Sequence, residues 1–434
     1  MAQRTSRSLS HSLYSQSIGK AVADFFTPAS KKAPDLCHWR TVDDSLLVCR
    51  YDKPDASASI RPRKIAAFDF DSTLITTQSG KKFSRAANDW RWWHASVVPT
   101  LTRLVDEGYL VAVVSNQAGL SLDPDSKTLK QDRVKVNTFK EKASAVFRAL
   151  DLPVTLYAAT KYDLFRKPRT GMWNALLADH GLAAADVDHA ASLFVGDAAG
   201  RTAGLRGSKD FSCSDRDLAA NVGIQFHTPE EYFLKDEPRP FARSFEPGDF
   251  LANLADTTVN GDFTYTRRND LDIVLFVGSP GAGKSTFYWT HLQPLGYERV
   301  NQDILKTREK CLATAATHLA SSQSVCVDAT NADIDVRSHW IALAKRFQVP
   351  IRCVHFTAPP RLCEHNDAVP EGGEIGSLNP ENRTMLPRMA FAGFAKRFVE
   401  PKVSEGFQDI VKVDFVFRGD EVARSVWGRY WVSS

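Results

Sequence analysis

The chain has 434 residues, which is long enough for two or three domains that each bury a core. With 43% hydrophobic and 24% charged residues, its composition is that of an ordinary soluble globular protein. The net charge of +4 is compatible with a nucleic-acid partner but does not by itself indicate one. Seven cysteines without a CxxC pair argue against a disulfide framework and a zinc site, and favour reduced thiols in the nucleus or cytosol. No apolar run approaches the roughly 18 residues of a membrane span.

Residues 1–60 are predicted to be a disordered N-terminal arm. The first 23 residues contain no acidic side chain and are rich in serine, so they have too little apolar content to fold alone. The same acid-poor character, with arginine and serine, is typical of a mitochondrial transit peptide. A mitochondrial location is therefore the alternative to the nucleus.

Residues 61–236 alternate between short apolar runs and longer segments with the apolar spacing of a helix, such as residues 129–151. The runs of strand length lie at 64–70, 109–116, 154–160 and 191–197. Strands that alternate with helices predict an α/β domain whose mainly parallel sheet is covered on both faces.

Three of these runs end in polar side chains of a catalytic type, at Asp69, Ser115 and Asp197. Ligands of open α/β sheets bind at the carboxyl ends of the strands, so we expect the three to meet in one crevice, with Lys167 of "FRKPRTGMW". The first run also carries Asp71. Two aspartates at a strand end fit a solvated turn, but a buried carboxylate is costly unless it is paired, so they also suggest a specific chemistry.

A second alternating series occupies residues 271–434, after a proline-containing stretch at 237–270 that is interpreted as a linker or irregular crossing. Its predicted strands lie at 271–278, 298–303, 324–330, 351–357 and 409–417. The predicted fold is thus two α/β domains in tandem.

The stretch "GSPGAGKS", which begins at Gly278, satisfies the phosphate-binding pattern GxxxxGK[ST] and lies between a predicted strand and a predicted helix. Backbone N–H groups of such a loop wrap phosphates, and the N-terminus of the following helix favours negative charge. We expect Lys284 to reach the β- and γ-phosphates of ATP and the Ser285 hydroxyl to hold Mg²⁺. The predicted ATP-binding residues are Gly278, Gly281, Gly283, Lys284, Ser285 and Thr286.

Two aspartates follow later predicted strands of this domain. A kinase needs a carboxylate to accept the proton of the attacking hydroxyl, and Asp303 is the leading candidate, although aspartate is also favoured as a helix N-cap. Asp328 either assists Mg²⁺ through water or caps the next helix, and the sequence does not separate these two roles.

The stretch from Asp69 to Thr73 resembles the DxDxT signature of haloacid-dehalogenase-type phosphatases, which form an aspartyl phosphate. The resemblance implies that Asp69 attacks phosphorus and that Asp71 protonates the leaving oxygen and then activates water. The family also uses a hydroxyl, a lysine and a distal acid, for which Ser115, Lys167 and Asp197 stand in suitable order. The implied Mg²⁺ ligands are Asp69, Asp71 and Asp197. Ser72 stands where the family more often has glycine.

From about residue 61 to the C-terminus the chain resembles the bifunctional polynucleotide phosphatase/kinases of eukaryotes. The resemblance rests on "FDFDSTLI", "VVSNQAGL", "RKPRTGMW", "FVGDAAGR", "KDFSCSDR", "TPEEYFLKD", "GSPGAGKSTF" and "VNQD". It implies a phosphatase followed by a P-loop kinase, which together convert 3′-phosphate and 5′-hydroxyl ends at DNA strand breaks into ligatable ends, with Mg²⁺ and ATP. An RNA-end-healing enzyme and a metabolic phosphatase/kinase fusion are the alternatives.

Two departures from this family stand out. The N-terminal phosphopeptide-binding domain of the animal enzymes has no room in this chain. The family's arginine-bearing stretch after its "HN" pair is replaced by "HNDAVPEGGEIGS", so the arginine that stabilises the transferring phosphate is left open between Arg361, Arg383 and Arg388.

Within the arm, "KAVADFFTPASKK" resembles the peptide by which repair proteins dock on the sliding clamp PCNA. Val22, Phe25 and Phe26 would supply the aliphatic and aromatic anchors, and Gly19 stands where the usual glutamine is expected. A clamp partner fits a nuclear enzyme. The alternative is that the two phenylalanines pack on the phosphatase domain.

Overall fold

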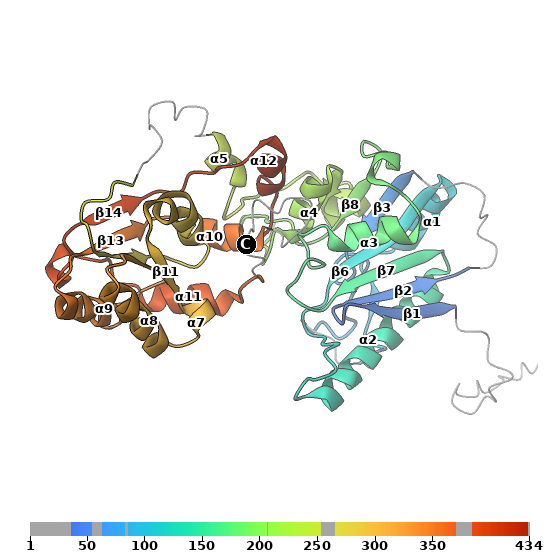
Figure 1. The fold of residues 1–434 in the computed structure, drawn as a ribbon. Helices are drawn as coiled ribbons and strands as arrows, with labels where there is room; N and C mark the ends of the chain where they lie inside the picture. Colours follow the sequence, from blue (N-terminus) through green and yellow to red (C-terminus); the bar gives the residue numbers. More distant parts are fainter. Residues whose placement is uncertain are drawn as a thin grey trace, which may run out of the picture.

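The computed structural model describes residues 36–53, 63–82, 86–205, 207–252, 265–369 and 384–432. These residues form two α/β domains that stand side by side, each built on its own sheet (Figure 1). The prediction of two α/β domains in tandem is confirmed. We call the described residues up to 236 the first domain and those from 265 onward the second domain.

The first domain contains a seven-stranded sheet. The five strands β7, β6, β3, β8 and β9 are parallel to one another, and β2 pairs antiparallel with both β7 and β1. In sheet order the strands are β1 (Cys37–Val42), β2 (Leu46–Tyr51), β7 (Val154–Ala159), β6 (Tyr109–Asn116), β3 (Lys64–Phe68), β8 (Leu193–Val195) and β9 (Gln225–His227). A short hairpin, β4 (Ile75–Thr76) with β5 (Arg91–Trp92), follows β3.

The prediction of a disordered arm that extends to residue 60 is wrong for residues 37–51, which form the hairpin of β1 and β2 at the sheet edge. Residues 43–45 connect the two strands, and Asp43 and Asp44 both have a φ of 48°, a left-handed backbone that glycine or asparagine usually supplies. Residues 1–35, which include the proposed clamp-binding peptide, lie outside the described residues.

Helices cover both faces of the first sheet, as predicted. Because side chains alternate along a strand, Ala66 and Phe68 of β3 pack with α1 (Val97–Asp106) and α2 (Leu129–Leu150). Ile65 and Ala67 pack on the other face, with α3 (Gly171–Asp179) and α4 (Ser214–Val222). The carboxyl ends of the parallel strands stay open between these layers.

The second domain contains a fully parallel sheet of five strands. Their order is β11 (Glu298–Asn301), β12 (Val325–Asp328), β10 (Ile273–Val277), β13 (Ile351–Phe356) and β14 (Ile410–Val413). Helices α8 (Arg308–Ala320) and α9 (Ile334–Phe347) pack on one face, and residues of α6 (Lys284–Phe287) and α11 (Arg388–Arg397) pack on the other. The remaining helices are α7 (Gln302–Leu305), α10 (Pro360–Ala368) and α12 (Glu421–Trp427).

The segment predicted as a linker, 237–270, contains the short helix α5 (Pro247–Ala252), and its Tyr265 is buried in the second-domain core. The domains also meet at Asn221 of α4, whose side-chain amide donates to the carbonyl of Tyr430 and accepts from the N–H of Tyr430, each at 2.8 Å. This paired contact docks the chain after α12 on the first domain.

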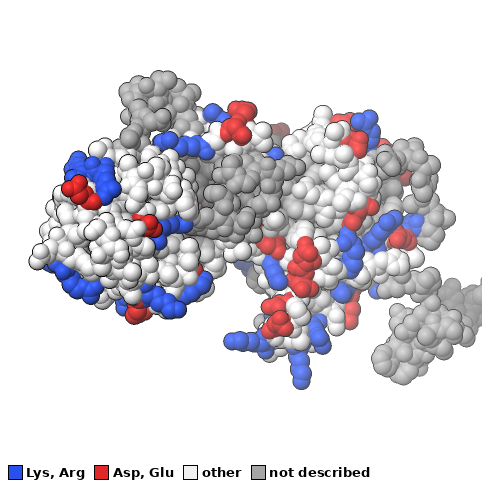
Figure 2. Space-filling view, viewed as in Figure 1, with Lys and Arg blue, Asp and Glu red and all other residues white. Residues whose placement is uncertain are grey.

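Acidic and basic side chains are interspersed over the face of the molecule in Figure 2, in keeping with the small net charge. Within the described ranges, no helix is both long enough and apolar enough to cross a bilayer.

Candidate active sites

The first site is built around Lys167, which is 2% exposed and lies between two carboxylates. Its Nζ is 2.8 Å from Asp69 Oδ1, 2.8 Å from Asp215 Oδ1 and 2.7 Å from the carbonyl oxygen of Val114. Burial opposes the charge on Lys167, but Asp215 and Asp69 outweigh it and raise its pKa. The lysine therefore stays cationic beside Asp69, directly after β3.

Three carboxylates of this site could hold a metal ion, because Asp69, Asp197 and Asp215 each offer an oxygen within 4.8 Å of the others. Burial raises the pKa of both Asp69 and Asp197, and the neighbouring carboxylates raise them further, while Lys167 offsets only part of this. So much buried negative charge calls for a cation, and carboxylate oxygens are hard ligands that suit Mg²⁺. The residues present thus fit a magnesium ion.

Asp71 is not part of this cluster. The resemblance implied Asp69, Asp71 and Asp197 as the metal ligands, whereas the structure groups Asp215 with Asp69 and Asp197. The Asp71 side chain is 49% exposed, accepts from Gln117 Nε2 at 2.8 Å and pairs with Lys142 Nζ at 3.0 Å. Gln117 Nε2 also donates to the hydroxyl of the buried Ser115 at 3.1 Å. Gln117 therefore links Ser115, the predicted catalytic hydroxyl, to Asp71, the predicted acid/base. An accessible carboxylate can exchange protons with a substrate and with water.

Ser72, the departure from the family pattern, adopts a φ of 62° in the turn that follows Asp71. This left-handed backbone is where glycine is ordinarily preferred, and a serine there carries a modest strain. The turn nevertheless closes, because the Ser72 N–H donates to the carbonyl of Ile75 at 2.8 Å. The substitution leaves Asp69 and Asp71 on either side of Phe70 in the arrangement just described.

Asp215, which the sequence reasoning missed, enters from the first turn of α4 rather than from a strand end. Its Oδ2 accepts from the N–H of Ala198 at 3.0 Å, and it is 1% exposed. A Cβ on Gly196 would lie 2.2 Å from Oδ2, so only glycine allows this approach. The one signal in the sequence is that Asp215 lies in "KDFSCSDR", one of the stretches that resemble the family.

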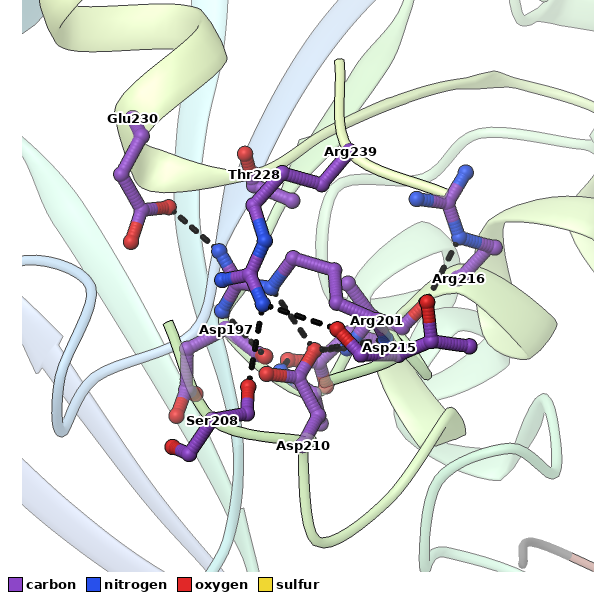
Figure 3. Close-up of polar contacts among 12 residues, drawn as sticks. Asp197, Arg201, Ser208, Asp210, Asp215, Arg216, Thr228, Glu230 and Arg239 are labelled. Carbon is purple, nitrogen blue, oxygen red and sulfur yellow. Dashed lines mark hydrogen bonds and ion pairs between the residues drawn. The ribbon is translucent and has the colours of Figure 1, made fainter. Parts of the chain in front are cut away.

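A buried arginine, Arg201, fixes the loop between Asp197 and α4 (Figure 3). Its guanidinium bonds Asp210 at 2.8 Å, Glu230 at 2.6 Å and the carbonyl oxygen of Asp197 at 3.2 Å. Arg239 bonds two further carbonyls of the same loop, those of Thr202 and Ser208. This network holds the backbone of Asp197 and so limits how far the metal ligands can spread.

A cavity of about 470 Å³ opens above these carboxylates, which is large enough for more than a phosphate group. It is lined by residues of both domains: Asp69, Asn116, Ala118, Thr160, Lys161, Tyr162, Arg166, Lys167, Asp197, Ala198, Phe211, Ser212, Ser214, Asp215 and Arg388.

The second site is the loop between β10 and α6. A Cβ on Gly281, whose φ is +71°, would lie 2.2 Å from the carbonyl oxygen of Cys363, so the loop requires glycine there. Lys284 Nζ bonds the carbonyl oxygens of Ser279 at 2.6 Å and Gly278 at 3.2 Å, which places the ammonium over the loop. Gly283 directly precedes α6, and Thr286 is exposed on its first turn. The strand–loop–helix context predicted for this motif is present.

Asp328 ends β12 beside this loop, and the structure separates its two suggested roles. Its carboxylate accepts from the Ser285 hydroxyl at 2.8 Å and pairs with Arg299, while Asp333 caps α9 by accepting from the N–H of Val336. The capping role is therefore wrong. A buried carboxylate bonded to the P-loop hydroxyl is placed where a nucleotide-bound Mg²⁺ would be held.

Asp303 is not an N-cap either, because Asn301 caps α7 and accepts from the N–H of Asp303 at 2.8 Å. The exposed Asp303 carboxylate lies on the first turn, and its role as a base stays a prediction. Of the three arginines left open, Arg361 pairs with Glu364 at 2.9 Å, and Arg383 lies outside the described residues. Arg388 lines the cavity of the first site.

Comparison with known proteins agrees with both sites. A family model described as "Polynucleotide kinase 3 phosphatase" matches residues 64–233, and an "AAA domain" model matches residues 273–401. A bifunctional polynucleotide phosphatase/kinase of Schizosaccharomyces pombe is 39% identical over 376 residues, which cover 86% of this chain and 84% of that protein.

The chain belongs to the bifunctional polynucleotide phosphatase/kinases. It is an enzyme with two activities, a polynucleotide 3′-phosphatase in the first domain and an ATP-dependent polynucleotide 5′-hydroxyl kinase in the second. A putative bifunctional polynucleotide phosphatase/kinase of Acanthamoeba polyphaga mimivirus is 29% identical, over 85% of this chain and 88% of that protein. A polynucleotide 3′-phosphatase of Arabidopsis thaliana is 34% identical over 210 residues, which cover 47% of this chain and 28% of that protein.

Proposed function

We propose that this enzyme heals DNA strand breaks, and that its phosphatase acts through an aspartyl phosphate. The observation that carries the mechanism is the Lys167 ammonium held 2.8 Å from Asp69 Oδ1, beside an accessible Asp71. The lysine opposes the effect of burial on Asp69 and so favours its ionised form, and an ionised carboxylate is the form that acts as a nucleophile.

In the proposed reaction, an Asp69 oxygen forms a bond to the 3′-phosphorus as the bond to the 3′ oxygen of the strand breaks. Asp71 gives its proton to that oxygen, which leaves as a 3′-hydroxyl. Asp71 then takes a proton from water as the water attacks phosphorus, and Asp69 is released with inorganic phosphate. A Mg²⁺ ion held by Asp69, Asp197 and Asp215 would neutralise charge on the phosphate.

In the kinase domain, Lys284 and the loop N–H groups would hold the ATP phosphates, and Ser285 with Asp328 would hold Mg²⁺. Asp303 would accept the proton of the 5′-hydroxyl as its oxygen attacks the γ-phosphorus and ADP leaves. The two reactions together give the 3′-hydroxyl and 5′-phosphate that a ligase needs.

The test uses a nicked duplex with a 3′-phosphate and a 5′-hydroxyl, in DNA and in RNA, with Mg²⁺ and ATP, and follows each end separately. Asp69→Asn should abolish 3′-phosphate removal and leave 5′ phosphorylation, and Lys284→Ala should do the reverse. Beryllium fluoride with Mg²⁺ should mimic the aspartyl phosphate and inhibit only the phosphatase. A faster reaction on the RNA nick would identify RNA rather than DNA as the substrate. Loss of both activities in either folded variant would refute the assignment of the two activities to separate sites.

We also propose that the enzyme works in the nucleus and that Val22, Phe25 and Phe26 dock on the clamp PCNA. The support is the peptide pattern of the arm alone. Microscopy of the tagged full-length chain tests the location, and a mitochondrial signal would identify the arm as a transit peptide.

A further inference from the structure

Among the described residues, one basic side chain of the second domain lines the phosphatase cavity. Arg388, the first residue of α11, lines it together with Lys161 and Arg166 of the phosphatase domain. The carboxylates of Asp69, Asp197 and Asp215 lie in the same cavity. The cavity therefore combines a carboxylate centre with basic side chains that come from both domains.

The basic residues gather around one aromatic ring. The guanidinium carbon of Arg388 lies 5.2 Å from the centre of the Tyr162 ring, and that of Arg169 lies 4.5 Å from it. Both distances are in the range of cation–π contacts. Tyr162 thus brings an arginine of each domain together beside Arg166.

These cations repel one another. The pKa of Arg166 is lowered, first by burial and also by the charges of Arg388 and Arg169, and Tyr162 and Asp163 offset only part of this. Arg169 is 1% exposed, and its Nε has no hydrogen-bond partner. The repulsion between such partly buried like charges is offset when an anion binds between them.

The position of Arg388 is fixed by contacts on both sides of it. Met385, three residues earlier, lies with its sulfur 3.0 Å from Arg169 Nη2. Phe391, three residues later, is buried in the kinase core with Ala282 of the P-loop. On the far side of the junction, Asn221 bonds both Tyr430 and the carbonyl of Pro168, the neighbour of Lys167.

We propose that Arg388 of the kinase domain, with Arg166 and Lys161, binds the phosphodiester next to the terminal 3′-phosphate, so that the kinase domain completes the substrate site of the phosphatase. The proposal rests on the 3′-phosphatase function. A terminal phosphate at Asp69 is followed on a polynucleotide by a phosphodiester one nucleotide away, and arginine is the side chain best suited to hold it. A mononucleotide has no such group, so this site would select for polymer ends.

The experiment compares two small ligands that differ by one phosphate, thymidine 3′-monophosphate and thymidine 3′,5′-bisphosphate, whose 5′-phosphate stands in for the phosphodiester. Each is assayed as a substrate and as a competitor of a 3′-phosphorylated oligonucleotide, with the full chain. Wild type should prefer the bisphosphate about tenfold, the value of one charge-assisted hydrogen bond. Arg388→Gln should remove most of that preference and leave the monophosphate unchanged, and Arg388→Lys should restore part of it.

Arg397→Gln is the matched control, because it removes the same charge from the other end of α11, where Arg397 pairs weakly with Asp333 at 3.8 Å. It should keep the wild-type preference. In the oligonucleotide assay, Arg388→Gln should also reduce the slope of log KM against log salt by about one.

Several results would overturn the proposal. They are a wild type without preference for the bisphosphate, a preference that survives in Arg388→Gln, and an equal loss on both ligands. A loss of 5′-hydroxyl phosphorylation with the preference intact would instead assign Arg388 to the kinase reaction. Failure of the proposed DNA function would look different, because it would appear in wild type as a faster reaction on RNA nicks.

Discussion

Asp215→Asn is the most informative single change in the phosphatase site, because it keeps the shape of the side chain and removes its charge. In the structure, this carboxylate pairs with Lys167 at 2.8 Å and accepts from the N–H of Ala198 at 3.0 Å. Loss of a buried charged partner usually costs about 3–5 kcal/mol. Here the loss also relieves Asp69 and Asp197, whose pKa values Asp215 raises, so we expect a net destabilisation of about 2 kcal/mol.

The larger effect should be on magnesium. A ligand at 100 times its Kd stabilises the folded state by about 2.7 kcal/mol. If loss of one carboxylate weakens binding about 100-fold, the same Mg²⁺ concentration gives only about 0.4 kcal/mol. Asp215→Asn should therefore lose most of the Mg²⁺-dependent stabilisation, together with 3′-phosphatase activity, while the kinase persists.

The assay is calorimetric titration with Mg²⁺ in the absence of nucleotide, beside thermal unfolding with and without the ion. Asp217→Asn is the control, since it lies on the same helix, is 3% exposed and pairs with Arg243 at 2.7 Å. It should destabilise the fold without changing the affinity for Mg²⁺. Unchanged Mg²⁺ affinity and phosphatase activity in Asp215→Asn would show that Asp215 only positions Lys167.

Three further predictions concern other parts of the chain. Asp303→Asn should lower the kinase kcat by about 10²–10⁴-fold and leave the phosphatase intact, and an unchanged kcat would exclude it as the base. Burial lowers the pKa of His365 to about 4, so the unfolded chain binds its proton first as the pH falls, and between pH 7 and pH 5 this should cost about 2 kcal/mol. Denaturation of wild type and His365→Gln at both pH values checks this, and equal pH dependence would refute it. A peptide of residues 15–35 should bind PCNA with micromolar affinity in calorimetry, and a Phe25→Ala/Phe26→Ala peptide should not; equal heats would remove the idea.

Much of the fold could be predicted because periodicity and strand ends agree in both domains. The run at 109–116 is β6 without any shift, and the other predicted strands contain the observed ones. The hairpin of β1 and β2 was missed for a physical reason. Its turn uses two aspartates in the left-handed region, whereas a glycine or asparagine would have marked it, and the apolar run "LLVC" of β2 was the signal that remained.

Some residues of the phosphatase site could also be predicted from the sequence, and others could not. Asp69, Ser115 and Asp197 could be placed together because each lies at the carboxyl end of a parallel strand, and topology brings such ends to one edge. Asp215 comes from a helix, and Arg388 comes from another domain. Neither follows from local spacing, because long-range packing alone decides which helix end or which domain surface meets the crevice.

Both domains bind phosphate, but the charges of their two sites are opposite in sign. The kinase loop offers N–H groups and Lys284, which attract phosphate directly. The phosphatase centre offers Asp69, Asp197 and Asp215 against one lysine, an arrangement that repels phosphate unless positive charge comes from elsewhere. A metal ion can supply part of it at the centre. Arg166 and Arg388 add positive charge to the lining of the same cavity, so the kinase domain contributes to the attraction of a polyanion to the phosphatase site.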